Sequence, residues 1–188
     1  MAYQQVLAED RSVFSIQWIT IPHEHSTGLT SEKLLSDYLS YIEKVTLRLI
    51  KTRMNAEGVT MRLSPAGPDL ISLAHPVTVR SENGTRTTLR ICGGFLVQPG
   101  ECNVGQLDFL TESVPSGTRV ALRLADYCPL LLGSRKPSLF RRWLYRLTQA
   151  LIHKVVAVRF LAMIYRTSTG KGLKKGAVKV AIRSGDPT

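Results

Sequence analysis

Two side chains that can exchange protons fall on predicted strands and are the first candidates for chemistry. His75 lies in segment 70–80, on the same face as an apolar row of Ile71, Leu73, Val77 and Val79. Asp126 ends a second row, formed by Val120, Leu122 and Leu124. A buried imidazole or carboxylate needs a partner, so both in one cavity would anchor a ligand or act as an acid/base pair. Alternatively, His75 bonds to the backbone and Asp126 lies at a frayed strand end.

Other reactive residue types lack the spacing that a reaction requires. His23 and His25 have the separation of two zinc ligands, but no third and fourth ligands cluster nearby. The sequence has no GxSxG, HExxH or GxGxxG motif, and Cys128 has no identifiable base partner. We therefore expect no metal and no cofactor, and a ligand-binding protein rather than an enzyme.

The elements that would position His75 and Asp126 follow from hydrophobic periodicity. Segment 12–21 is typical of a strand with Phe14, Ile16 and Trp18 on one face, and apolar residues at helical spacing predict a helix from Thr30 or Ser31 toward Arg53. Five further strands are predicted at 59–63, 70–80, 85–97, 104–113 and 118–127. A long helix follows from about residue 138 to 165.

This order of elements, over roughly residues 12–165, resembles the helix-grip fold of the START and polyketide-cyclase-like superfamily (SRPBCC). The resemblance implies an α+β fold in which a curved antiparallel sheet of about six strands wraps around a long C-terminal helix and encloses a cavity. We expect one domain at 1–166 and a basic, mobile tail at 167–188, in which 178–182 forms a short edge strand.

The resemblance also implies function. In this superfamily the fold serves lipid carriage, cyclisation of polyketides and other reactions in a shaped pocket. We expect binding or carriage of a small hydrophobic ligand of the lipid, polyketide or isoprenoid type, and a cyclase- or hydrolase-type enzyme using His75 and Asp126 as acid and base is the alternative. The expected cavity wall consists of Trp18, Tyr41, His75, Phe95, Phe109, Asp126, Tyr127, Trp143 and Leu147.

The positive charge gathers at one end of the chain. Residues 1–132 hold 12 Lys/Arg against 13 Asp/Glu, whereas residues 133–188 hold 13 against 1. A basic end of this kind suits an anionic membrane surface, and nucleic-acid binding is the alternative. The residues expected to make this contact are Arg141, Arg142, Arg146, Lys154, Arg159, Arg166, Lys171, Lys174 and Lys175.

The cysteine content and the N-terminal residues indicate in which cell compartment the protein is expected. The chain has three cysteines, an odd number, and no CxxC pair. Such spacing is typical of reduced thiols rather than of a disulfide framework. The N-terminal segment carries the acidic pair Glu9 and Asp10 and lacks the pattern of a signal peptide. We therefore expect a cytoplasmic protein that contacts a membrane peripherally.

Overall fold

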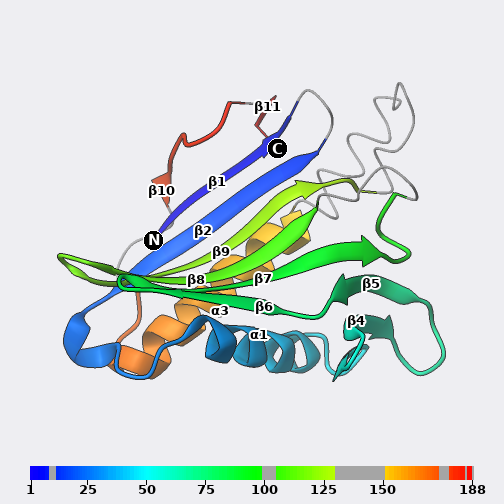
Figure 1. Cartoon of the computed structure of the whole chain (residues 1–188), viewed down its shortest axis with the longest axis horizontal. Coiled ribbons are helices and arrows are strands. Elements are labelled where there is room, and N and C mark those ends of the chain that lie inside the picture. Colours follow the sequence, from blue (N-terminus) through cyan, green and yellow to red (C-terminus); the bar gives the residue numbers. More distant parts are fainter. Residues whose placement is uncertain (9–11, 99–104, 130–150, 174–177, 185, 188) are drawn as a thin grey trace.

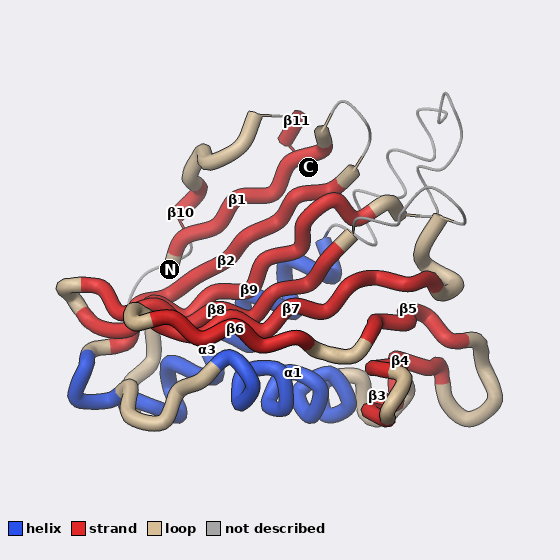
Figure 2. Tube along the Cα trace, in the orientation of Figure 1, coloured by secondary structure: helices blue, strands red, loops and turns tan. Residues whose placement is uncertain are grey.

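A computed structural model describes residues 1–8, 12–98, 105–129, 151–173, 178–184 and 186–187. Its main feature is one curved, eleven-stranded sheet with the strand order β10-β1-β2-β9-β8-β7-β5-β4-β3, in which β11 also pairs with β1 and β6 with β7. Neighbouring strands are antiparallel except for β1 and β10. Two helices, α1 (Ser31–Val45) and α3 (Leu151–Thr169), pack on one side of this sheet (Figures 1 and 2). The predicted α+β architecture is confirmed.

The sheet has more strands than the six or so predicted. The predicted strands appear as β2 (Val13–Ile21), β4 (Gly58–Leu63), β5 (Asp69–Ala74), β6 (Val77–Ser81), β7 (Gly84–Gly93), β8 (Gln106–Val114) and β9 (Gly117–Tyr127). The additional strands are β1 (Ala2–Leu7), β3 (Ile50–Asn55) and β11 (Asp186–Pro187), while β10 (Val178–Lys179) corresponds to the edge strand predicted in the tail. All four lie at or near the two ends of the sheet, where strands are short and polar and leave a weak sequence signal.

The predicted strand 70–80 is in fact two strands. It breaks at His75 and Pro76, because proline has no N–H to donate to a sheet ladder. At the end of β7 the chain bends at Gly93 and Gly94, which have φ of 148° and 123°. A Cβ on Gly94 would lie 2.5 Å from the carbonyl oxygen of Leu70, so the close approach of the two chain segments requires glycine there.

Helix α1 begins as predicted but ends early. The Thr30 side chain accepts a hydrogen bond from the Lys33 amide, as an N-cap does. The prediction that the helix continues toward Arg53 is wrong. Leu47 and Arg48 have φ of 51° and 62°, which end the helix, and β3 begins at Ile50. The apolar spacing continues through this region, so periodicity alone did not reveal the end.

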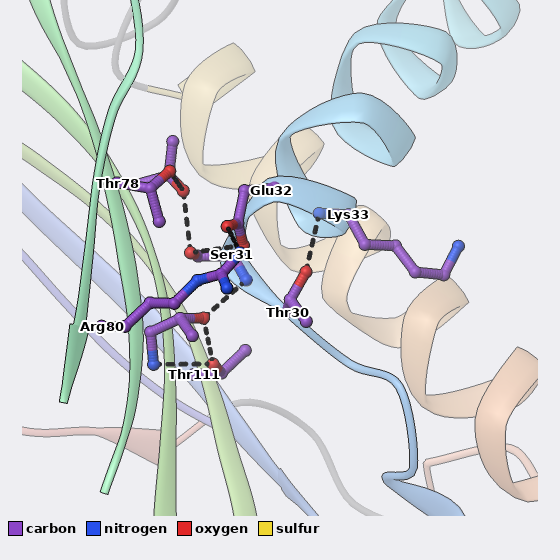
Figure 3. A network of polar contacts seen from close by, with 9 residues as sticks. Thr30, Ser31, Glu32, Lys33, Thr78, Arg80 and Thr111 are labelled. Carbon is purple, nitrogen blue, oxygen red and sulfur yellow. Dashed lines mark hydrogen bonds and ion pairs between the residues drawn. The ribbon is translucent and has the colours of Figure 1, made fainter. Parts of the chain in front are cut away.

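Hydroxyl groups attach the first turn of α1 to the sheet (Figure 3). The Ser31 amide donates to Thr85 Oγ1 at 2.8 Å, and the Ser31 and Thr87 hydroxyls lie 2.8 Å apart. The network extends to Thr111 through Thr85 and to Thr78 through Thr87. An ion pair of 3.0 Å between Glu32 and Arg80 lies beside it. These contacts fix where α1 begins relative to β6, β7 and β8.

Part of the segment predicted to be a mobile tail pairs with the sheet. The amides of Val178 and Val180 donate to the carbonyls of Met1 and Tyr3 at 3.0 and 2.9 Å. The Gln4 side chain accepts from the amides of Ile182 and Arg183. The predicted edge strand at 178–182 is thus present as the shorter β10. The unpaired carbonyl groups along the edge of β1 thus accept hydrogen bonds from the backbone of the tail.

At the other end of the sheet, Glu43 joins α1 to β3. Its carboxylate accepts from the Thr52 amide at 2.8 Å and from the Thr52 hydroxyl at 2.9 Å. The amide and hydroxyl donors of Thr52 lower the pKa of Glu43 below 4.5, because they stabilise the ionised form. Ionised Glu43 therefore stabilises the folded state above about pH 4.5, and this stabilisation is lost as the pH falls through its folded-state pKa.

We expect Glu43→Gln to remove the pH-dependent stabilisation that the ionised Glu43 carboxylate provides. The difference in melting temperature between the wild type and the variant should be largest near neutral pH and should shrink on acidification. Thermal unfolding followed by circular dichroism at a series of pH values measures it. A difference that is constant or grows toward acid pH would contradict the assignment.

Candidate functional site

Three of the residues predicted to line a cavity lie between the sheet and the helices. Phe109 on β8 is buried against Tyr38, Tyr41 on α1 lies 5.6 Å from the Phe160 ring of α3, and the buried Tyr127 donates its hydroxyl to the Leu96 carbonyl at 2.7 Å. Burial raises the pKa of Tyr41, and the nearby Arg159 opposes this increase. The role of these three residues in ligand contact stays a prediction.

Three other residues that were predicted to line the cavity do not lie between the sheet and the helices. Residues of β2 alternate, and Val13, Ile19 and Ile21 belong to the main core, so Trp18 lies on the opposite face, away from the helices. His75 is exposed at the break between β5 and β6, and its Nδ1 lies 3.1 Å from the Pro76 carbonyl oxygen. Phe95, after the glycine bend, is 59% exposed. None of these three side chains lines the interior.

The proposed acid/base pair is not assembled. Asp126 lies at a bulge of β9 with φ of 52°, and its carboxylate pairs with Arg183 at 2.8 Å. His75 follows β5, and the strands β7 and β8 lie between β5 and β9. Three strand spacings amount to about 14 Å, far beyond hydrogen-bond reach. The interpretation of His75 and Asp126 as one catalytic unit is therefore wrong.

Much of the predicted basic surface and of the cavity wall lies outside the described residues. This applies to Arg141, Arg142, Trp143, Arg146, Leu147, Lys174 and Lys175. Lys154 belongs to the first turn of α3, and Arg159, Arg166 and Lys171 are exposed.

The most unusual feature of the interior is a polar row on β1 and β2. Ser15 and Gln17 have the same parity as Val13, Ile19 and Ile21, so they face the helices, and α3 packs against β2. In the sheet register Gln5 lies opposite Ser15, and Tyr3 lies opposite Gln17. The flanking positions of β2 and β9 are apolar, including Leu122 opposite Gln17. The row is therefore a small polar area in an apolar interior.

Gln17 leaves one of its polar atoms without a partner in the described part of the chain. Its side chain is 0% exposed, and its Nε2 donates to Ser15 Oγ at 2.6 Å, but its Oε1 has no hydrogen-bond partner among the described residues. Exchanging the amide oxygen and nitrogen would only transfer the deficit to the nitrogen. A buried polar atom without a partner costs about 1–3 kcal/mol, so its position beside a buried hydroxyl points to a bound group.

The chemistry available in this row is hydrogen bonding without proton transfer near neutral pH. Its side chains are two amides, one aliphatic hydroxyl and one phenol. Tyr38 on α1, which packs against Phe109 and Phe160 and not in this row, has a raised pKa because burial disfavours its charged form. Such a row suits a neutral polar group on a mostly apolar molecule.

The sequence contained a signal for this row that the prediction did not use. In SVFSIQWITI, the even positions Phe14, Ile16 and Trp18 are all apolar, whereas the odd positions include Ser15 and Gln17. The prediction places Trp18 of this apolar face in the cavity wall. In the structure Phe14 and Ile16 of the same face pack with Val6 and Ala125 on the other side of the sheet. Polar residues in a strand with two apolar faces can therefore mark a polar row in the interior.

Two kinds of feature are absent from the described residues. Within the described ranges, no group of three or more His, Cys, Asp or Glu side chains is arranged to hold a metal ion. Likewise, none of the helices described combines the length and hydropathy needed to cross a bilayer.

Comparisons with known proteins show distant structural likeness only. No protein-family model matches the sequence, and no curated protein matches it. The solution structure of the Aha1 dimer from Colwellia psychrerythraea is 16% identical, over 92% of this chain and 100% of that chain, with a TM-score of 0.43. CalU16 from Micromonospora echinospora is 15% identical, over 87% and 83%, with a TM-score of 0.37, and Ara h 8.0201 is 11% identical, over 79% and 97%, with a TM-score of 0.39.

Proposed function

We propose that this protein binds a small, mostly apolar ligand between the helix-facing side of its sheet and α3. The unpartnered amide oxygen of Gln17 carries the proposal, since it is buried beside Ser15 in an apolar surrounding. A mostly apolar ligand that carries one hydrogen-bond donor, such as a hydroxyl group, could donate to this oxygen. Carriage of a lipid, polyketide or isoprenoid-like molecule is the corresponding biological role.

Several related predictions accompany this proposal. The element order β2, α1, antiparallel strands and α3 supports a relationship to the START and polyketide-cyclase-like superfamily. The exposed Arg159, Arg166 and Lys171 support contact of the C-terminal end with anionic membranes, and nucleic-acid binding through that end is the weaker alternative. Binding has more support than catalysis, because the described polar row lacks an acid/base pair.

The test is native mass spectrometry of the freshly purified protein, with solvent extraction and identification of any molecule released. We expect a stoichiometric apolar adduct. Gln17→Leu should retain much less of it, by roughly tenfold, because the ligand loses its acceptor. The same variant should be at least as stable as wild type without ligand, because it removes an unsatisfied buried group.

A matched control is Gln4→Leu, which replaces a buried glutamine on the opposite face of the sheet. This variant should loosen the contact with residues 182–183 and leave the adduct unchanged. If no adduct appears and Gln17→Leu is strongly destabilising, Gln17 has a structural role and the proposal fails.

A further inference from the structure

The loop between α1 and β3 carries an unusual amount of exposed apolar surface. Leu47 is 86% exposed, Leu49 60% and Met54 on β3 52%. Val45, the last residue of α1, is also exposed. Single exposed apolar residues are ordinary, but four within ten positions form a cluster of the kind that marks an interaction site.

The loop backbone holds the exposed Leu47 in a conformation that has a cost. Leu47 and the following Arg48 both adopt left-handed φ, of 51° and 62°, although neither is glycine or asparagine. The arrangement is well fixed, because the Arg48 amide donates to the Glu43 carbonyl at 2.7 Å and the Leu49 amide to the Thr46 carbonyl at 2.9 Å. Strain of this kind is typically retained where the displayed side chain has a use.

Cations dominate the charge around the loop, and Glu43, just before it, is the one adjacent carboxylate. Residues 44–54 contain Lys44, Arg48, Lys51 and Arg53 and no acidic residue. The carboxylate of the adjacent Glu43 is already occupied by Thr52. Apolar side chains surrounded by cations are the combination with which peripheral proteins bind anionic lipid surfaces.

A groove beside the loop adds a place for a polar head group. Its volume is about 630 Å³, and it is lined by Ser36, Leu39, Ser40, Glu43, Lys44, Arg48, Thr52 and Met54. The hydroxyls of Ser36 and Ser40 and the cations of Lys44 and Arg48 offer donors to a phosphate or carboxylate. The groove therefore suits the head group of an anionic lipid.

We propose that the α1–β3 loop docks this protein on anionic membranes. Leu47 and Leu49 enter the apolar layer, and the four cations contact lipid head groups. This surface is separate from the basic C-terminal end and does not depend on the interior ligand site.

Flotation with lipid vesicles tests the proposal, using phosphatidylcholine alone or in equal parts with phosphatidylserine. We expect wild type to bind only the mixed vesicles and to release them on addition of salt. Leu47→Asn combined with Leu49→Ser should reduce the partition coefficient roughly tenfold or more. Asparagine accepts the left-handed conformation, so this variant should remain folded by circular dichroism.

Two control variants distinguish this loop from other surfaces. Val77→Ser with Val79→Ser removes exposed apolar side chains from β6, and binding should be unchanged. Arg159→Gln, Arg166→Gln and Lys171→Gln together should reduce binding less than Arg48→Gln, Lys51→Gln and Arg53→Gln together.

Three outcomes would overturn the proposal. They are no binding of wild type to mixed vesicles, loss of binding only with the C-terminal variant, and a loop variant that abolishes self-association in size-exclusion chromatography while vesicle binding persists. The last outcome would mean that a second copy of the chain covers the loop.

Discussion

Phe160→Ala should lower the free energy of unfolding by about 4 kcal/mol, the largest effect expected of any single substitution in the described core. Phe160 is 0% exposed, and its ring lies 5.2 Å from that of Tyr38 and 5.6 Å from that of Tyr41. The ring therefore joins α3 to α1. Removing it leaves a cavity between two helices that the sheet holds in place, and such a cavity closes only partly.

Urea unfolding followed by circular dichroism measures this effect as a shift in the transition midpoint at unchanged slope. Phe160→Leu should cost less, about 1–2 kcal/mol, because most of the volume is kept. Phe95→Ala is the matched control, since this ring is largely exposed and its loss should cost under about 1 kcal/mol. A cost for Phe160→Ala equal to that of Phe95→Ala would contradict the described packing of α3.

The second large effect is expected at Asp108 on the face of the sheet away from the helices. Asp108 is 0% exposed, and its carboxylate accepts from Arg86 Nε at 3.0 Å, Arg123 Nε at 2.7 Å and the Thr88 hydroxyl at 2.6 Å. Three strands, β7, β8 and β9, thus share one anion. We expect Asp108→Ala to cost about 3 kcal/mol, since it removes the partner of two cations and leaves Thr88 without its acceptor.

The cost of Asp108→Ala is at the lower end of the range for buried pairs because both arginines are partly exposed and can be rehydrated. Asp37→Ala is the control. Asp37 pairs with Lys33 at the exposed surface of α1, where such a pair contributes little, under about 0.5 kcal/mol. Equal midpoints for the two variants in urea would show that the Asp108 cluster is not a stabilising unit.

Features with a local physical cause could be predicted from the sequence. The N-cap at Thr30 needs only one side-chain oxygen, which Thr30 itself supplies. The antiparallel strands β7, β8 and β9, which pair in chain order, could be predicted from their periodicity. Their connections involve neighbouring segments only, so no long-range information was required.

Features that depend on distant partners could not be predicted in this way. The pairing of β1 with β10 joins residues near opposite ends of the chain, and nothing in either short segment specifies the other. The end of α1 depends on left-handed Leu47 and Arg48, which residue type disfavours. The polar row was missed because β2 has two apolar faces, and which of them faces the interior depends on where the helices pack.

The strand order also determines when parts of the sheet can form during synthesis. Strands β1 and β2 form a hairpin early, but the partner of β2 is β9, which lies roughly a hundred residues later in the sequence. At ribosomal rates of about 5–20 residues per second, this hairpin waits about 5–20 seconds for its neighbour. During that interval both faces of β2 are open, including the apolar Phe14, Ile16 and Trp18. We therefore expect a ribosome-associated chaperone to shield these apolar residues until β9 has been made.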